Sequence, residues 1–146
     1  MNKFFVSIII FSIILSGCTF GDPENYTLLI FKGKSEDWEG EMEYVDSKEG
    51  EHPENLLKLN FTGEEVNSSI DVTIENSHIA QDISLSEFKN VSIELNESEI
   101  SKIVESKKNQ DNAINDSIEV KISWDDKQEI IQLIFNTSVQ RDGRDL

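Results

Sequence analysis

Residues 118–135, IEVKISWDDKQEIIQLIF, decide the fold of this chain. Polar residues separate the apolar positions of the first half, which are Ile118, Val120, Ile122 and Trp124. Asp125-Asp126-Lys127 supplies turn residues, and segment 128–135 then returns with Ile131, Leu133 and Phe135 on one face. Successive side chains of a strand point to opposite faces, so both halves have one apolar face. The stretch therefore predicts an antiparallel hairpin that packs one face into a core.

The same alternation continues outward along the chain. It is cleanest over residues 38–44, where Trp38, Gly40, Met42 and Tyr44 interleave with Glu39, Glu41 and Glu43. The three glutamates are predicted to form a solvated acidic ridge on the outer face of this strand. Further strands are predicted at 27–32, 57–61, 70–74 and 91–95, whereas residues 76–90 are ambiguous between strand and loop.

One segment has the pattern of a helix instead. Asn96 is followed three residues later by Glu99, which is typical of a helix N-terminus. Ile100, Ile103 and Val104 then share one helical face, and Lys107 suits the negative C-terminal end of the helix dipole. The pattern predicts a short helix over 97–107.

These elements predict a mainly β fold with one domain over residues 27–136. About seven short antiparallel strands joined by polar turns favour a β-sandwich. The sandwich is expected to be immunoglobulin-like in architecture only, because a chain with one cysteine has no cysteine pair to flank a core tryptophan. Residues 137–146 are predicted to be a polar tail.

The N-terminal residues predict a signal peptide. A positive start with Lys3 precedes the apolar segment 4–15, and small residues follow it. This segment is too short for a transmembrane helix, which needs about 20 apolar residues. The junction reads Leu15-Ser16-Gly17-Cys18 and contains the one cysteine of the chain. We expect residues 1–17 to be removed and residues 18–26 to be a modified N-terminus and short tether.

The junction resembles a bacterial lipobox, and the chain as a whole resembles the small uncharacterised lipoproteins of low-G+C Gram-positive bacteria. The residues on which this resemblance rests are the lipobox, the segment Gly33-Lys34-Ser35-Glu36-Asp37-Trp38 and the hairpin 118–135. The resemblance implies a diacylglyceryl group on Cys18, cleavage before it, and attachment to the extracytoplasmic face of the cell membrane. Because the family has no established activity, the resemblance implies no catalytic or binding residue.

Net charge limits the partners. The chain has 13 basic and 29 acidic residues, a formal charge of −16, and removal of Lys3 with the signal brings the charge to about −17. Such a surface repels nucleic acid and anionic wall polymers. The acidic loop that starts at Asp111 fails the calcium-loop pattern at Ala113, Asp116 and Ile122, so no metal site and no cofactor are predicted.

Catalytic motifs are missing from the sequence as well. His52 and His78 stand in separate loops, and no phosphate-binding, nucleophile-elbow or zinc-protease motif occurs. Glu39, Glu41 and Glu43 are spaced like a glycosidase pair, but an open ridge cannot raise the pKa of either carboxyl. Trp38 and Trp124 could stack on a ligand, although their alternation favours packing in the core.

The sequence thus predicts a membrane-anchored, non-catalytic interaction or binding module of unknown ligand. Its partners are expected to be the lipid bilayer, through Cys18, and an adjacent membrane or surface protein. The alternative is a calcium-binding surface protein that uses the acidic residues of strands and turns.

Overall fold

Most of the residues that the structure describes lie in one antiparallel sheet. The computed structural model describes residues 25–47, 53–64, 69–84 and 89–141. These residues form eight strands and one helix, which in chain order are β1 (Tyr26–Lys34), β2 (Trp38–Asp46), β3 (Asn55–Phe61), β4 (Ile70–Ile74), β5 (Ser77–Ile83), β6 (Asn90–Leu95), α2 (Glu97–Ser106), β7 (Ile118–Trp124) and β8 (Lys127–Arg141). The mainly β prediction, the short helix and the C-terminal hairpin are confirmed.

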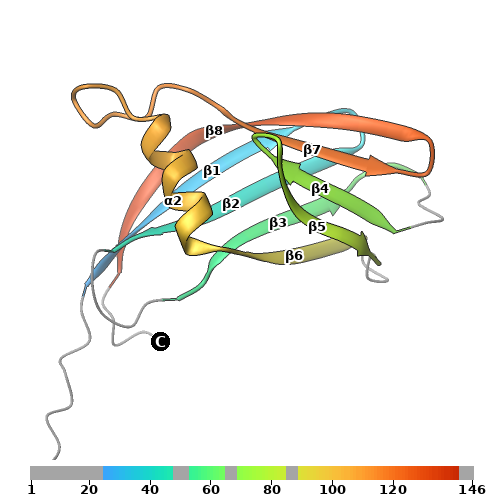
Figure 1. Ribbon diagram of the computed structural model, residues 1–146, viewed down its shortest axis with the longest axis horizontal. Helices are drawn as coiled ribbons and strands as arrows, with labels where there is room; N and C mark the ends of the chain where they lie inside the picture. Colours follow the sequence, from blue (N-terminus) through green and yellow to red (C-terminus); the bar gives the residue numbers. More distant parts are fainter. Residues whose placement is uncertain (1–24, 48–52, 65–68, 85–88, 142–146) are drawn as a thin grey trace, which may run out of the picture.

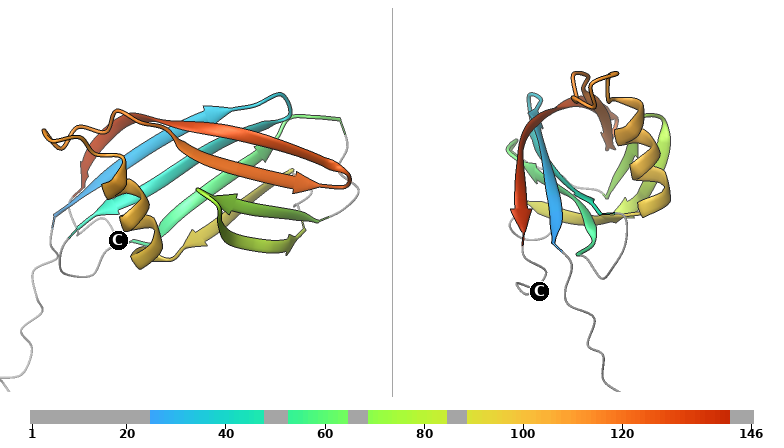
Figure 2. Two further views of the ribbon diagram at one scale, coloured as in Figure 1. Left: turned by 45° about the horizontal axis from the view of Figure 1, so that its top comes forward. Right: turned by 90° about the vertical axis from the view of Figure 1, so that its left-hand side faces the viewer.

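The sheet curls until it nearly closes into a barrel (Figure 1, Figure 2). Its strand order is β5-β4-β7-β8-β1-β2-β3-β6. Strand β8 is 15 residues long; it pairs with β7 over residues 127–133 and with β1 over residues 134–141. Because one unbroken strand belongs to both halves, the predicted sandwich of two separate sheets is replaced by a single curled sheet.

A bulge in β8 explains why the alternation of apolar and polar residues did not predict its second half. Phe31 pairs with Phe135, but Ile30 pairs with Thr137, so Asn136 is an extra residue between them. A bulge resets the alternation of faces and increases the local twist. The strand then continues to Arg141, so the part of the predicted polar tail before residue 142 is in the sheet. Residues 142–146 lie outside the described residues.

The inner face of the sheet holds the core. The buried apolar side chains of this core come from seven strands and the helix, which contributes Ile100 and Val104. At one end of the barrel Trp38 contacts Phe61 and Trp124, with ring centroids 5.0 and 5.6 Å away. Both tryptophans are on the inner face, as their alternation predicts.

Helix α2 packs against the side of the curled sheet, beside the hairpin of β4 and β5 (Figure 2). Its N-cap is Asn96, whose side-chain oxygen accepts a hydrogen bond from the Glu99 N–H, as predicted. At the other end Lys107 lies 2.8 Å from Glu75 in the β4–β5 turn, and Lys108 lies 3.7 Å from Asp46 of β2. Two lysines therefore fasten the helix to two separate parts of the sheet.

The lysine–carboxylate contact at Glu75 predicts a pH dependence of stability. Burial raises the pKa of Glu75, but hydrogen bonds from Lys107 and from the Glu119 N–H outweigh it and hold the pKa below its usual value. A lowered carboxyl pKa adds stability above the unfolded value of about 4.3, and this stability is lost as the pH falls through the folded-state pKa.

We therefore expect the wild-type protein to lose more unfolding free energy than Glu75→Gln between about pH 6 and about pH 3. Urea unfolding at each pH measures the difference. Glu94→Gln, an exposed glutamate on β6, is the control and should behave like the wild type. Equal losses in wild type and Glu75→Gln would show that the contact adds nothing.

The lipobox residues Leu15, Ser16, Gly17 and Cys18, with the signal segment 1–17, lie outside the described residues. In the part of the chain that the structure describes, the one helix, α2, is too short and too polar to cross a membrane.

Candidate functional site

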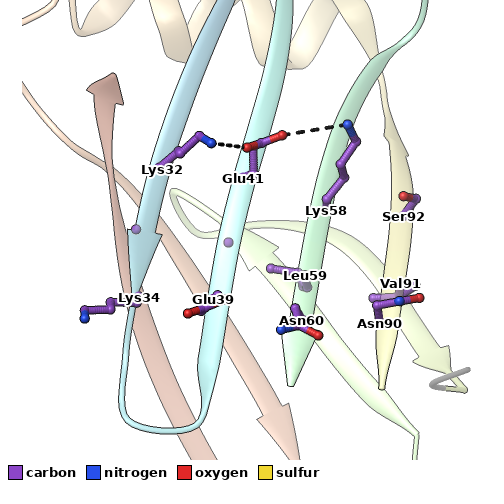
Figure 3. A pocket seen from close by; sticks show the side chains of 12 residues that line it. Lys32, Lys34, Glu39, Glu41, Lys58, Leu59, Asn60, Asn90, Val91 and Ser92 are labelled. Atoms are coloured by element: carbon purple, nitrogen blue, oxygen red, sulfur yellow. Dashed lines mark ion pairs between the residues drawn. The ribbon is translucent and has the colours of Figure 1, made fainter. Parts of the chain in front are cut away.

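The outer face of β1, β2, β3 and β6 carries a groove of about 760 Å³ that runs across the strands. Strand register arranges its lining in three cross-strand rows (Figure 3). The first row is Lys32, Glu41, Lys58 and Ser92. The middle row is Gly33, Gly40, Leu59 and Val91, and the third row is Lys34, Glu39, Asn60 and Asn90. The outer rows form two walls, and the backbone of the middle row forms the floor.

A pair of facing glycines shapes the floor. Gly33 and Gly40 stand directly opposite each other on β1 and β2. A Cβ on Gly33 would meet the backbone oxygen of Gln132 and lie 2.8 Å from Cγ2 of Ile131. A Cβ on Gly40 would lie 3.1 Å from Cδ2 of Leu133. The absence of both side chains lets this part of β1 and β2 lie close to residues 131–133 of β8.

Ion pairs neutralise one wall. Lys32 Nζ lies 2.6 Å from Glu41, and Lys58 contacts Glu41 at 3.8 Å and Glu43 more closely. The hydrogen bond from Lys32 holds the pKa of Glu41 below its usual value. Two of the three glutamates of the predicted acidic ridge are therefore paired with lysines of β1 and β3, whereas Glu39 has no such pair within the described residues.

The other wall offers polar groups that the described residues leave without a partner. Lys34, Glu39 and Asn60 are exposed, and within the described ranges their side chains make no hydrogen bond or ion pair. Lys34 and Glu39 are a direct cross-strand pair, yet Figure 3 shows the Lys34 side chain directed away from Glu39. An exposed ammonium, a carboxylate and an amide thus line the groove.

The groove also has a local charge balance unlike that of the chain. Three lysines and two glutamates line it, whereas acidic residues outnumber basic ones 29 to 13 in the whole sequence. On a strongly anionic surface, this region is the more favourable one for a ligand that carries some negative charge. The lining of the groove therefore has a less negative net charge than the chain as a whole.

A second hollow of about 830 Å³ lies at the end of the barrel where β1 begins and is a weaker candidate. Its apolar wall is Leu29, Ile114 and Phe135. Its charged groups are already engaged with one another, because Lys108 contacts Asp46 and Glu105. The hollow therefore belongs to the contacts that fasten α2.

The two tryptophans considered from the sequence offer no ligand surface. Trp38 and Trp124 are 0% and 2% exposed, so neither presents a surface on which a ligand could stack. His78 is exposed on β5, and His52 lies outside the described residues. Sequence reasoning missed the groove, although Lys34, Glu39 and Asn60 all stand at positions that the alternation assigns to the outer face.

The described residues include no group of three or more histidine, cysteine or acidic side chains that could hold a metal ion. Near Asp111, the Asn109 side-chain oxygen accepts hydrogen bonds from the N–H groups of Asp111 and Ala113, so Asn109 shapes that loop. A glycosidase needs one carboxyl with a raised pKa, and the pKa of Glu41 is lowered. No family model, curated protein or solved structure matches this chain.

Proposed function

We propose that this protein is a lipid-anchored binding module on the extracytoplasmic face of the cell membrane, and that the outer-face groove is its ligand site. The role is non-catalytic, and the partner is a molecule or protein segment at or near the membrane surface. The observation that carries the proposal is the groove wall of Lys34, Glu39 and Asn60, whose side chains are exposed and without partners in the described structure.

The N-terminal sequence supports the proposed anchor. Signal segment, small residues and Cys18 stand in the order of a lipoprotein signal. Two or more acyl chains hold a protein firmly on a bilayer, since each buried methylene contributes about 0.8 kcal/mol. Seven residues separate Cys18 from Tyr26, the first residue of β1, and they span at most about 25 Å. A groove on this domain would therefore work close to the membrane.

Replacement of Cys18 by alanine tests the anchor. We expect wild-type protein to incorporate labelled palmitate and to sediment with membranes. Cys18→Ala should lose the label, and its membrane-bound fraction should fall about tenfold or more, because one thioether carries the acyl chains. Thr19→Ala changes the neighbouring residue and is the matched control, which should behave as wild type. Label incorporation by Cys18→Ala would overturn the lipid-anchor assignment.

The calcium-binding alternative has less support. Two of the three glutamates on β2 are paired with lysines, which compete with a cation for the same oxygens. No observation in the described part of the chain favours a site with the six to eight oxygen ligands that calcium takes.

A further inference from the structure

The length of the groove suits a short stretch of extended chain. The groove crosses four neighbouring strands, from β1 to β6. Strands lie about 4.8 Å apart, so the distance across four of them is about 14 Å. Extended chain rises about 3.3 Å per residue, so about four residues fit along the groove. The two walls are two residues apart on each strand, which separates them by about 6.8 Å.

Charge changes in order along the groove. At its β1 end both walls are cationic, with Lys32 and Lys34, and one strand further on both walls are anionic, with Glu41 and Glu39. Lys58 and Asn60 of β3 follow, and Ser92 and Asn90 of β6 make a neutral polar end. Lys32 and Lys58 are engaged with glutamates of β2, so Lys34 and Glu39 are the charges left for a ligand.

These groups do not suit other common ligands. No aromatic side chain lines the groove, so a sugar ring has no surface on which to stack. A polyanion would meet Glu39 and the negative surface beyond the groove. An apolar molecule would lie between two polar walls. A ligand with one acidic group, one basic group and amide dipoles matches the charge order.

We infer that the groove binds an extended peptide segment of about four residues that carries an acidic and a basic side chain two positions apart. Alternate side chains of an extended peptide lie on one side, so both charges face the same wall. The acidic group pairs with Lys34 and the basic group with Glu39. The amide of Asn60 faces the peptide's main chain. The inference rests on the proposed use of the groove as a ligand site.

The test uses the full-length chain in mild detergent, titrated with capped tetrapeptides while amide chemical shifts are recorded by NMR. The probes are Asp-Ser-Lys-Ser and its reverse, with Asp-Ser-Asp-Ser, Lys-Ser-Lys-Ser and tetraserine for comparison. We expect one mixed-charge order to bind most tightly and to shift the amides of Gly33 and Gly40. Added salt should weaken this binding.

Matched variants locate the contact. Glu39→Gln should reduce affinity for the mixed-charge peptide about fivefold, a loss of about 1 kcal/mol. Glu94→Gln makes the same charge change on β6 outside the groove lining and should leave the affinity unchanged. Lys34→Gln and Lys102→Gln form the second such pair, with Lys102 exposed on α2.

Failure of the peptide assignment and failure of the proposed ligand site give different results in this test. If mixed-charge peptides bind no better than tetraserine while an N-acetylglucosamine tetramer shifts Gly33 and Gly40, the groove is a ligand site and the peptide assignment is wrong. If the peptides shift only amides elsewhere, the peptide assignment is wrong as well. If none of these probes shifts the two glycines, both the peptide assignment and the proposed use of the groove are overturned.

Discussion

Replacing Trp38 with alanine is expected to lower the free energy of unfolding by about 3–5 kcal/mol. Trp38 is fully buried, and its ring lies 5.0 Å from that of Phe61 and 5.6 Å from that of Trp124. Alanine would remove both aromatic contacts and leave a cavity at this end of the barrel. The loss is measured by urea unfolding, and the fluorescence of Trp124 should report a changed environment.

Trp38→Phe is the informative companion variant. In the described structure the indole N–H groups of Trp38 and Trp124 are buried without an acceptor. A buried, unsatisfied donor costs about 1–3 kcal/mol, so its removal offsets part of the lost packing. We expect Trp38→Phe to cost only about 1 kcal/mol. A loss of unfolding free energy as large for Trp38→Phe as for Trp38→Ala would contradict this account. It would show that the indole N–H has an acceptor and contributes to stability.

Gly33→Ala is expected to destabilise the fold by about 3 kcal/mol, the upper end for an added methyl group in a packed region. The new Cβ would lie against the Gln132 backbone, with the carbonyl carbon 2.9 Å away. Backbone cannot rotate aside as a side chain can, so β1 would have to separate from β8. Thermal unfolding should show the loss, and the same NMR amides should show the groove floor displaced.

Gly40→Ala is the control for that prediction, because Gly40 faces Gly33 in the same cross-strand row. Its nearest contacts would be the ends of Leu133 and Ile131, at 3.1 and 3.2 Å. Such side chains can shift by a few tenths of an ångström, so we expect a loss of about 1 kcal/mol. Equal losses at the two glycines would contradict the account of backbone contact at Gly33.

Much of the fold is visible in the sequence because one face of each strand is buried. Alternation identified seven of the eight strands, including Trp38–Asp46 and the hairpin of β7 and β8. Asn96 and Glu99 identified the start of the helix, since the cap is a local feature. Burial of Trp38 and Trp124 followed from the same alternation.

The remaining features depend on irregular pairing. Strand β5 has no period of two because its register with β4 shifts twice and Asp82 has a positive φ of 53°. Alternation identifies the buried face of a strand but not whether the sheet stacks on another or curls on itself. The curl depends on the length of β8, its bulge at Asn136 and the facing glycines.

The groove could not be predicted for a related reason. Its walls join residues from four strands, and their order depends on cross-strand register. Glu41 was assigned to the outer face correctly, but its partners Lys32 and Lys58 become visible only when β1 and β3 are placed on either side. The sequence therefore shows the sign of each charged side chain, but not which residue of a neighbouring strand it pairs with.

The pairing of β1 with β8 has a consequence for the time course of folding. Gln140 donates a hydrogen bond to Thr27 across 113 positions of sequence, at 2.8 Å. Contacts between the two ends of a chain slow folding, because a long loop must close before they can form. Until residue 140 is available, β1 can pair only with β2, and its other edge is open to association with other chains. Pairing with β8 therefore covers the edge of β1 that would otherwise be open to other chains.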